Sequence, residues 1–240
     1  MGAIRIGTAG WSIPRQVADM FPAEGSALER YAARFPVVEI NSSFHRPHRV
    51  STWERWRDSV PAAFRFSVKL PKTMTHERKL LGCETLLDEF ASRAGALGEK
   101  LAVVLVQLPP KLGFEPHIAG AFFEALASRC TAAIACEPRH PGWFTAEAEA
   151  LLDAHRVCRV AADPARCDGA GAPGGWRGLS YWRLHGSPQM YRSSYADRIA
   201  DYAQALKAEA AERETWCIFD NTASSAATSD ALALGDASSA

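Results

Sequence analysis

Apolar and amphipathic segments alternate along this chain. Eight short, largely apolar runs are typical of buried strands, and most are followed by apolar residues at helical spacing. The predicted strands cover residues 4–9, 37–44, 64–70, 101–108, 132–136, 158–163, 179–185 and 215–221. Because these runs do not alternate strictly and helical segments separate them, the pattern predicts a parallel sheet covered by helices.

Local signals place several helix boundaries. Ser26–Glu29 and Ser51–Glu54 both have the spacing of a capping box, and each precedes a predicted helix. The segment 164–178 contains five glycines, which predict an irregular segment in place of a regular helix. A last helix is expected over 223–234, with a frayed tail from about residue 235.

The number of units predicts the fold. Eight strand–helix units in 240 residues favour one TIM-barrel-like (β/α)₈ domain over residues 1–240, with a doubly wound open sheet as the alternative. Connections from helix to strand are short, as at Pro36. Connections from strand to helix are long and rich in Trp, His and Gly. This asymmetry is expected if the functional site lies at the carboxyl ends of the strands.

Polar residues gather where the predicted strands end. The apolar run 132–136 is closed by Glu137, Pro138, Arg139 and His140. Since side chains alternate along a strand, residues two apart share a face of the sheet. The polar side chains expected at the inner rim are Glu39, Asn41, Lys69, Gln107, Glu137, Arg139, Asp163, Arg183 and His185, with Asp220 or Asn221 from the last strand. The alternative is a network of ion pairs that only satisfy one another.

This ring suggests acid/base chemistry. Glu137 and Glu39 are the candidate acid and base, in the manner of paired glycosidase carboxylates. His185 is the candidate proton shuttle, and Asp163 is a further catalytic candidate.

Other rim residues suggest how a substrate is bound. Phosphate or carboxylate groups suit Lys69, Arg139 and Arg183. The remaining candidate substrate contacts are Asn41, Gln107, His76, Asn221, Trp11, Phe44 and Trp143. The three aromatic residues either stack on a sugar or base or cap the barrel core.

A metal site is weakly indicated. His76, His140 and His185, together with the acidic residues of the ring, are possible ligands of a divalent metal. No compact histidine spacing supports such a site, and three cations compete with a metal in the same ring. We therefore predict no cofactor, while a divalent metal remains possible.

Composition limits the partners. Lysine plus arginine equals aspartate plus glutamate at 27 each, which argues against extended nucleic-acid binding but not against a small anionic ligand. No apolar run approaches the ~20 residues of a membrane span. The six cysteines include no CxxC pair, so we expect reduced thiols in a cytoplasmic protein. The expected partner is a small-molecule substrate.

Seven ordered motifs carry a family resemblance. They are GTAGW (7–11), VEINSSF (38–44), KLPKTMTHERKL (69–80), VQLPP (106–110), CEPRHPGWF (136–144), YWRLHG (181–186) and FDNTASSAA (219–227). With them the chain resembles the YecE-like family, known as domain of unknown function 72. The resemblance implies a TIM-barrel-like fold and an uncharacterised role. The family is also similar in outline to sugar isomerase and endonuclease barrels.

The sequence therefore predicts an enzyme that uses acid/base chemistry on a small anionic or sugar-like substrate. Two alternatives remain open. One is a non-catalytic barrel that binds a ligand or nucleic acid at the same rim. The other is a metal-assisted hydrolase or isomerase.

Overall fold

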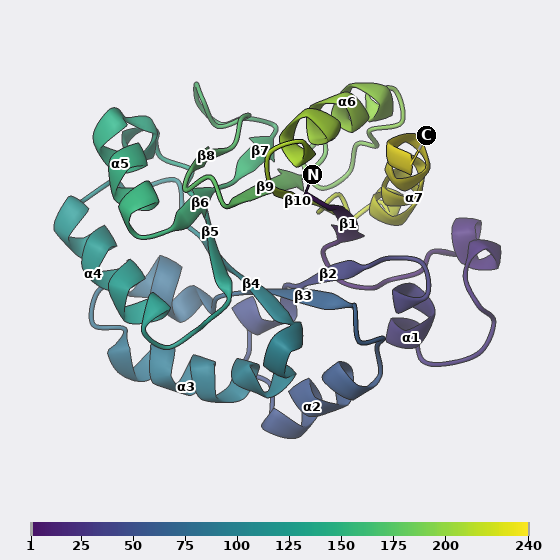
Figure 1. The fold of residues 1–240 in the computed structure, drawn as a ribbon, viewed down its shortest axis with the longest axis horizontal. Coiled ribbons are helices and arrows are strands. Elements are labelled where there is room, and N and C mark those ends of the chain that lie inside the picture. The colour runs from purple at the N-terminus through teal and green to yellow at the C-terminus, as the bar shows by residue number, and fades with distance from the viewer. Residues whose placement is uncertain (1, 240) are drawn as a thin grey trace.

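The computed structural model describes residues 2–239 and shows an α/β fold, with strands in the middle and helices around them (Figure 1). The strands are β1 (Ile4–Thr8), β2 (Val37–Ile40), β3 (Arg65–Lys69), β4 (Leu101–Gln107), β5 (Ala133–Glu137), β6 (Val157–Arg159), β7 (Ala161–Asp163), β8 (Gly174–Gly175), β9 (Leu179–Leu184) and β10 (Glu214–Phe219). The α-helices are α1 (Ala27–Ala32), α2 (Val50–Asp58), α3 (Glu84–Ala94), α4 (Pro116–Ala127), α5 (Ala146–Ala154), α6 (Ile199–Ala210) and α7 (Ala226–Ser239). Shorter helical turns are η1 (Arg15–Met20), η2 (Ser42–Phe44), η3 (Thr73–Glu77), η4 (Gly95–Lys100) and η5 (Pro141–Phe144).

The strands form two sheets. One has the order β1-β10-β9-β7 and the other the order β2-β3-β4-β5-β6-β8. Every pairing is parallel except that of β6 with β8, which confirms the predicted parallel arrangement. Among the described strands the sheets do not close into one continuous hydrogen-bonded barrel. They meet through a single bridge, Ala9 to Glu39, and through β6 and β7, which are successive in the chain but pair with different sheets.

Several predicted boundaries need correction. The strand expected over 158–163 is divided into β6 and β7. The strand expected over 37–44 ends at Ile40, because the Ser43 hydroxyl donates to the carbonyls of Ile40 and Lys69 and holds η2 as a turn. The capping box at Ser26 is confirmed. At Ser51 it is wrong, since α2 begins after Arg49 without a side-chain cap.

The glycine-rich and C-terminal segments also differ in detail from a simple barrel. Residues 164–178, all of them described, contain no helix, and Gly174–Gly175 pairs antiparallel with β6. The tail expected to fray from about residue 235 is helical as far as Ser239, since α7 continues to that residue.

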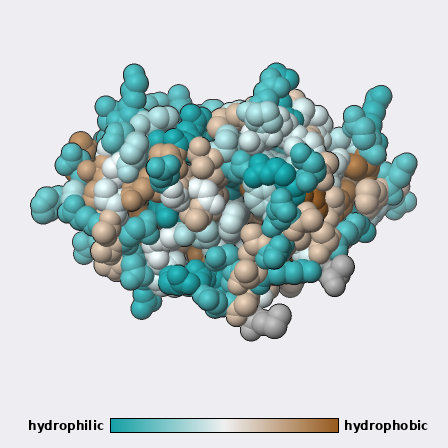
Figure 2. All heavy atoms as spheres, turned by 90° about the horizontal axis from the view of Figure 1, so that it is seen from above, coloured by the Kyte–Doolittle hydropathy of each residue, from teal (hydrophilic) through white to brown (hydrophobic). Residues whose placement is uncertain are grey.

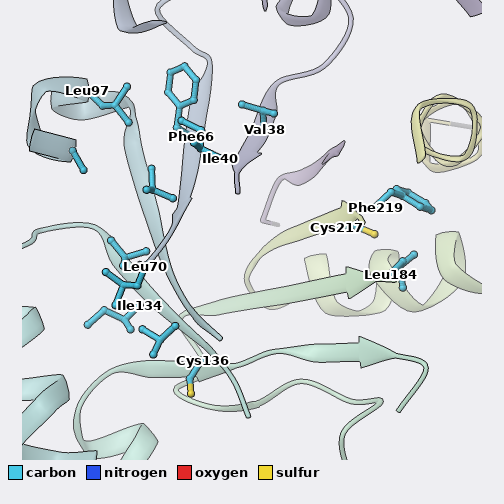
Figure 3. Packing of buried hydrophobic residues seen from close by; sticks show 14 of the residues in the cluster. Val38, Ile40, Phe66, Leu70, Leu97, Ile134, Cys136, Leu184, Cys217 and Phe219 are labelled. Atoms are coloured by element: carbon cyan, nitrogen blue, oxygen red, sulfur yellow. The ribbon is translucent and has the colours of Figure 1, made fainter. Parts of the chain in front are cut away.

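Alternation along the strands separates two hydrophobic cores. The larger lies between sheets and helices and includes Val38, Ile40, Phe66, Cys136 and Phe219 (Figure 3). The smaller core faces the space between the two sheets. It consists of Val37, Val103, Leu105, Ala135, Cys158, Val160, Leu179, Tyr181, Trp216 and Ile218. The members of this inner core show which residues of β2, β4, β5, β6, β9 and β10 point inward.

The surface carries few large apolar side chains. In the view of Figure 2 hydrophilic and hydrophobic residues are interspersed over the face. The exposed large hydrophobic residues of the described chain are Met20, Val50, Leu81 and Tyr191. No helix within residues 2–239 has the length and apolar character needed to cross a membrane. All six cysteines are free, as expected.

A tyrosine joins the two sheets where pairing between β1 and β2 is sparse. The hydroxyl of buried Tyr31 accepts from the Thr8 backbone N–H at 2.8 Å and donates to the Val37 carbonyl at 3.0 Å. The backbones of β1 and β2 can approach each other closely because residue 7 is glycine. A Cβ at this position would lie 2.3 Å from the Val37 carbonyl oxygen. Tyr31 therefore replaces part of the missing strand ladder.

Tyr31→Phe tests this role. We expect it to lower the free energy of unfolding by about 1–3 kcal/mol, because a buried N–H and a buried carbonyl lose their shared partner. Chemical denaturation of the variant and wild type measures the change. Ser51→Ala, which removes an exposed hydroxyl on α2, is the control and should change stability by less than about 0.5 kcal/mol. Equal losses in both variants would contradict the role of Tyr31.

Candidate functional site

The inward-facing polar residues at the carboxyl ends of the strands form one buried cluster. Its centre is Arg183 on β9, whose side chain is fully buried. The guanidinium donates to Glu39 at 2.7 and 3.0 Å and to Asp220 at 3.0 Å, and it also donates to Glu137. Three carboxylates from three elements are thus held by one cation.

The two glutamates of the cluster have no free oxygen. Glu39 also accepts from the Tyr181 hydroxyl at 2.9 Å. Glu137 accepts from Gln107 at 3.0 Å and from Arg139 at 2.9 Å. Burial would raise the pKa of Glu137, but Arg183, His185 and Arg139 outweigh it and lower the pKa well below the usual range. Glu137 is therefore a stable carboxylate at neutral pH.

His185 lies between two carboxylates. Its Nε2 is 3.2 Å from Glu137 and its Nδ1 is 2.9 Å from Asp220. Burial alone would lower the pKa of His185, but Glu137 and Asp220 raise it above the ordinary value. For Asp220 burial would raise the pKa, but Arg183 and His185 lower it. The arrangement favours an imidazolium held by two anions.

Lys69 is the exception in the cluster. It ends β3 and is 8% exposed. Its Nζ makes no hydrogen bond or ion pair with any residue in the described range 2–239; it lies 4.2 Å above the centre of the Phe44 ring. Burial and then Arg183 lower the pKa of Lys69, and the nearby carboxylates offset this only partly, so that the pKa is about 8. An amine in this setting is more easily deprotonated than a surface lysine.

Two other residues of the cluster also keep unused polar atoms. Nη2 of Arg139 and Oδ1 of Asn41 are buried without a hydrogen-bond partner among the described residues. Asn41 directly follows β2, and its Nδ2 donates to Asp220 at 3.4 Å. Buried polar atoms are almost always paired, so these two atoms are candidate contacts for a ligand.

Loops complete the rim. The Phe44 ring, positioned by η2, contacts the imidazole of His76 edge to face at 5.0 Å between centroids. Burial, Lys69 and Arg139 lower the pKa of His76, which favours the neutral ring. Tyr191, whose φ is 65°, packs against His185 at 5.8 Å and helps Glu137 to raise the pKa of Arg139. Sequence analysis missed Tyr191, because it belongs to no strand or motif.

The structure corrects the prediction for Asp163. Its carboxylate accepts from the Tyr202 hydroxyl and pairs with Arg198 at 2.7 Å, both near α6. Because Val160 of the same predicted strand faces the inner core, Asp163 has the opposite orientation and points toward the helices. It is not part of the cluster.

The last strand contributes Asp220 rather than Asn221. Ile218 faces the inner core, so the residue two positions later also faces inward. Asn221 points toward α7 and donates to Asp230 at 2.7 Å and to the Ser193 carbonyl at 2.9 Å. Asn221 therefore points away from the cluster, and its contact with substrate stays a prediction. Asp220 is the residue that joins the cluster.

Two of the three predicted stacking aromatics are packing residues. Trp143 is 1% exposed, its indole N–H donates to the Leu112 carbonyl at 3.0 Å, and its ring contacts Phe114. Trp11 packs edge to face on Trp56 at 5.1 Å. Only Phe44 lies beside the cluster.

The proposed pairing of Glu39 and Glu137 across a substrate is not the geometry observed. Arg183 binds both carboxylates and so occupies the space between them. For the same reason Arg183, expected to bind an anionic ligand, has its donors engaged by protein carboxylates. Both glutamates therefore have a positioning role toward Arg183 in this arrangement.

The acidic and histidine side chains do not present a metal site. In the part of the chain that the structure describes, no group of three or more His, Cys, Asp or Glu side chains is arranged to hold a metal ion. Both ring nitrogens of His185 already contact carboxylates. The imidazole of His140 accepts from the Gly142 N–H at the start of η5.

A comparison with known protein families shows to which family this chain belongs. The family described as Protein of unknown function DUF72 matches residues 5–240. The chain belongs to this family. It is 31% identical over 142 residues to the UPF0759 protein YecE of Escherichia coli (strain K12), covering 59% of this chain and 50% of that protein. To the UPF0759 protein YunF of Bacillus subtilis (strain 168) it is 31% identical over 113 residues, covering 45% of this chain and 40% of that protein. The chain spans about half the length of the curated relatives it matches, or less.

Solved structures share the DUF72 fold. A DUF72 family protein from Enterococcus faecalis V583 has a TM-score of 0.83 at 20% identity, covering 99% of this chain and 96% of that one. A DUF72 family protein from Thermotoga maritima MSB8 has a TM-score of 0.77 at 21% identity, covering 97% of this chain and 98% of that one. A D-allulose 3-epimerase from Methylomonas sp. gives a TM-score of 0.53 at 14% identity, covering 98% and 96%, which is a likeness of fold alone.

Trp143→Ala separates packing from stacking in this DUF72 protein. Removing a buried indole should lower the free energy of unfolding by about 3–5 kcal/mol. Trp11→Ala, at a half-buried site, should cost less. Denaturant unfolding measures both. A loss below about 1 kcal/mol for Trp143→Ala would contradict its assignment to the core.

Arg183→Met tests the central ion pairs. At pH 7 we expect a loss of about 3–5 kcal/mol, because three buried carboxylates lose their cation. The pKa values of Glu137 and Asp220 are lowered in the folded protein, so pairing stabilises the fold above the usual carboxyl range and is lost as pH falls through the lowered values. The cost should therefore shrink as pH falls below the ordinary carboxyl pKa values of 4.5 for Glu137 and 3.8 for Asp220. Arg183→Lys, which keeps the charge, should lose less; a cost independent of pH would contradict this account.

Proposed function

We propose that the cluster is the active site of an enzyme that carries out acid/base chemistry on a small anionic or sugar-like substrate. The observation that carries this proposal is Lys69, a buried cation left without an ion-pair partner beside three carboxylates. An unpaired buried charge lowers the stability of the fold, and a site that only stabilised the fold would gain by pairing or replacing it. A role in ligand binding explains why this unfavourable charge is present.

The roles follow from which atoms are free. Lys69 and Nη2 of Arg139 have unused donors and so bind the anionic group of the substrate. Lys69, with a pKa of about 8, also accepts and returns a proton near neutral pH. His76, with its neutral ring favoured, is the second candidate for proton transfer. Arg183 and its carboxylates position this set.

We further propose that the two sheets act as one TIM-barrel-like (β/α)₈ unit. The bridge from Ala9 to Glu39 and the continuity of β6 with β7 support this view. So does the location of the cluster, since barrel enzymes place their sites at the carboxyl ends of the strands. The similar fold of a D-allulose 3-epimerase makes a sugar-like substrate a reasonable class to test.

The second candidate is a barrel that binds a small ligand without reaction. It is favoured by the buried ion pairs, which leave few atoms of the cluster free. Solvent-deuterium exchange distinguishes the two functions. An enzyme that moves protons at carbon exchanges deuterium from D₂O into sugar phosphates or 2-oxo acids, while a binding protein raises its Tm with such a compound and exchanges nothing.

Lys69→Met should weaken ligand binding while raising stability. Because the folded protein lowers the pKa of Lys69 from 10.5 to about 8, the protonated amine opposes folding at pH 7. We expect the variant to gain up to about 2–3 kcal/mol there. Wild-type stability rises relative to the variant between pH 8 and 10.5, as its own lysine deprotonates, so the gain shrinks over that window. Unfolding at several pH values measures it.

The functional half of this test uses matched ligands. Inorganic phosphate, 2-oxo acids and sugar phosphates should raise the Tm of wild type and of Lys72→Met, an exposed lysine paired with Glu77. The same ligands should leave the Tm of Lys69→Met unchanged. If Lys69→Met instead loses stability and keeps the ligand response, Lys69 is a structural residue and the proposed site is wrong.

A further inference from the structure

We infer that Lys69 is the nucleophile of this site and forms a covalent imine with a small aldehyde or ketone that carries a carboxylate or phosphate next to its carbonyl. This inference rests on the proposed function and names its substrate class. It goes beyond proton transfer, because it assigns a bond between the protein and the substrate.

The first support is the isolation of the amine. Lysines near carboxylates are normally held as ammonium ions in salt bridges, which removes the nitrogen lone pair. Here Glu39, Glu137 and Asp220 are all engaged by Arg183. The nitrogen of Lys69 is thus placed beside acidic groups without being bound by one. Only 8% of the residue is exposed, so the amine is largely removed from water.

The second support is the way the amine is positioned. The Ser43 hydroxyl donates to the Lys69 carbonyl at 2.7 Å and so holds η2 against the end of β3. This places the Phe44 ring 4.2 Å from Nζ. The contact restricts the flexible lysine to one side of the cluster. A restricted nucleophile needs less ordering to reach a carbonyl carbon than a mobile surface lysine.

The third support is the ease of deprotonation. An amine with a pKa of about 8 carries roughly 300 times more neutral form at pH 7 than one at the ordinary value of 10.5. Desolvation beside another cation is the way in which proteins activate lysines for imine formation. Here burial is the largest cause, and Arg183 is the adjacent cation.

The fourth support is a place for the anionic group. Arg139 uses Nε for Glu137 at 2.9 Å, while its buried Nη2 is unpaired. A carboxylate or phosphate satisfies that donor. The Oδ1 atom of Asn41, whose Nδ2 donates to Asp220 at 3.4 Å, is an unpaired acceptor and suits the hydroxyl of the addition intermediate. These two atoms together select a carbonyl compound with a nearby anion.

The reaction balances without an added oxidant or reductant. His76 takes a proton from the Lys69 ammonium, and the nitrogen lone pair then forms the C–N bond while the C=O π electrons move to oxygen. The alkoxide takes up the proton released by the nitrogen and becomes a hydroxyl. His76 returns its proton to that hydroxyl, which leaves as water while the nitrogen lone pair forms C=N. Ammonium and carbonyl thus give protonated imine and one water.

Reductive trapping tests the inference. The full chain is incubated separately with glyoxylate, pyruvate and dihydroxyacetone phosphate at pH 7 in the presence of cyanoborohydride, which reduces imines to stable amines. Peptide mass analysis then compares Lys69 with exposed Lys72. We expect at least one probe to modify Lys69 10-fold or more over Lys72, at a rate that rises to a plateau above pH 8. Modification of Lys69 no greater than that of Lys72 with every probe overturns the imine.

Two variants refine the test. Arg139→Met should reduce trapping of the anionic probes about 10-fold more than trapping of propanal, an uncharged aldehyde. An equal loss for propanal would overturn the assignment of the anion to Arg139. The failure of the imine is distinguishable from that of the proposed function. If no probe is trapped but Lys69→Met still abolishes the Tm response, the acid/base site stands and the covalent step falls.

Discussion

The buried guanidinium of Arg183 is the interaction on which the carboxyl ends of the strands depend. It lies on β9 and binds Asp220, which follows β10 of the same sheet, but it also binds Glu39 of β2 and Glu137 of β5 in the other sheet. Among residues 2–239 a single β-bridge, between Ala9 and Glu39, joins the two sheets at β1 and β2. Side-chain ion pairs therefore join them at this end, and Tyr31 joins them at the seam itself.

This central role changes how the other charges act. Because Arg183 engages all three carboxylates, none remains for Lys69, and burial then lowers the pKa of its amine. The ion pairs that Arg183 makes thus leave the amine of Lys69 unpaired and more reactive. His185 is likewise held by Glu137 and Asp220, so it is oriented rather than free. The atoms left for a ligand are those of Lys69, Arg139 and Asn41.

The comparisons with relatives show the family and the fold of this chain, but they do not show which reaction it carries out. DUF72 structures from two bacteria share the fold at about one-fifth sequence identity, and a D-allulose 3-epimerase has a less similar fold. A fold of this kind supports many chemistries through the side chains at its strand ends. The chemistry proposed for this chain therefore rests on its own amine, its cationic neighbour and their unpaired atoms.

The sequence by itself determined the alternation of strands and helices, the family, and the strand ends at which polar residues gather. Period-two alternation correctly placed Glu39, Lys69, Glu137 and Arg183 on one face, because each strand carries its own inward residues. Consistent use of the same rule would have favoured Asp220 over Asn221. Only the tertiary structure decided which charges pair, since Arg183 contacts carboxylates far away in the chain. That pairing, invisible in any local pattern, is what leaves Lys69 free and Asp163 outside the site.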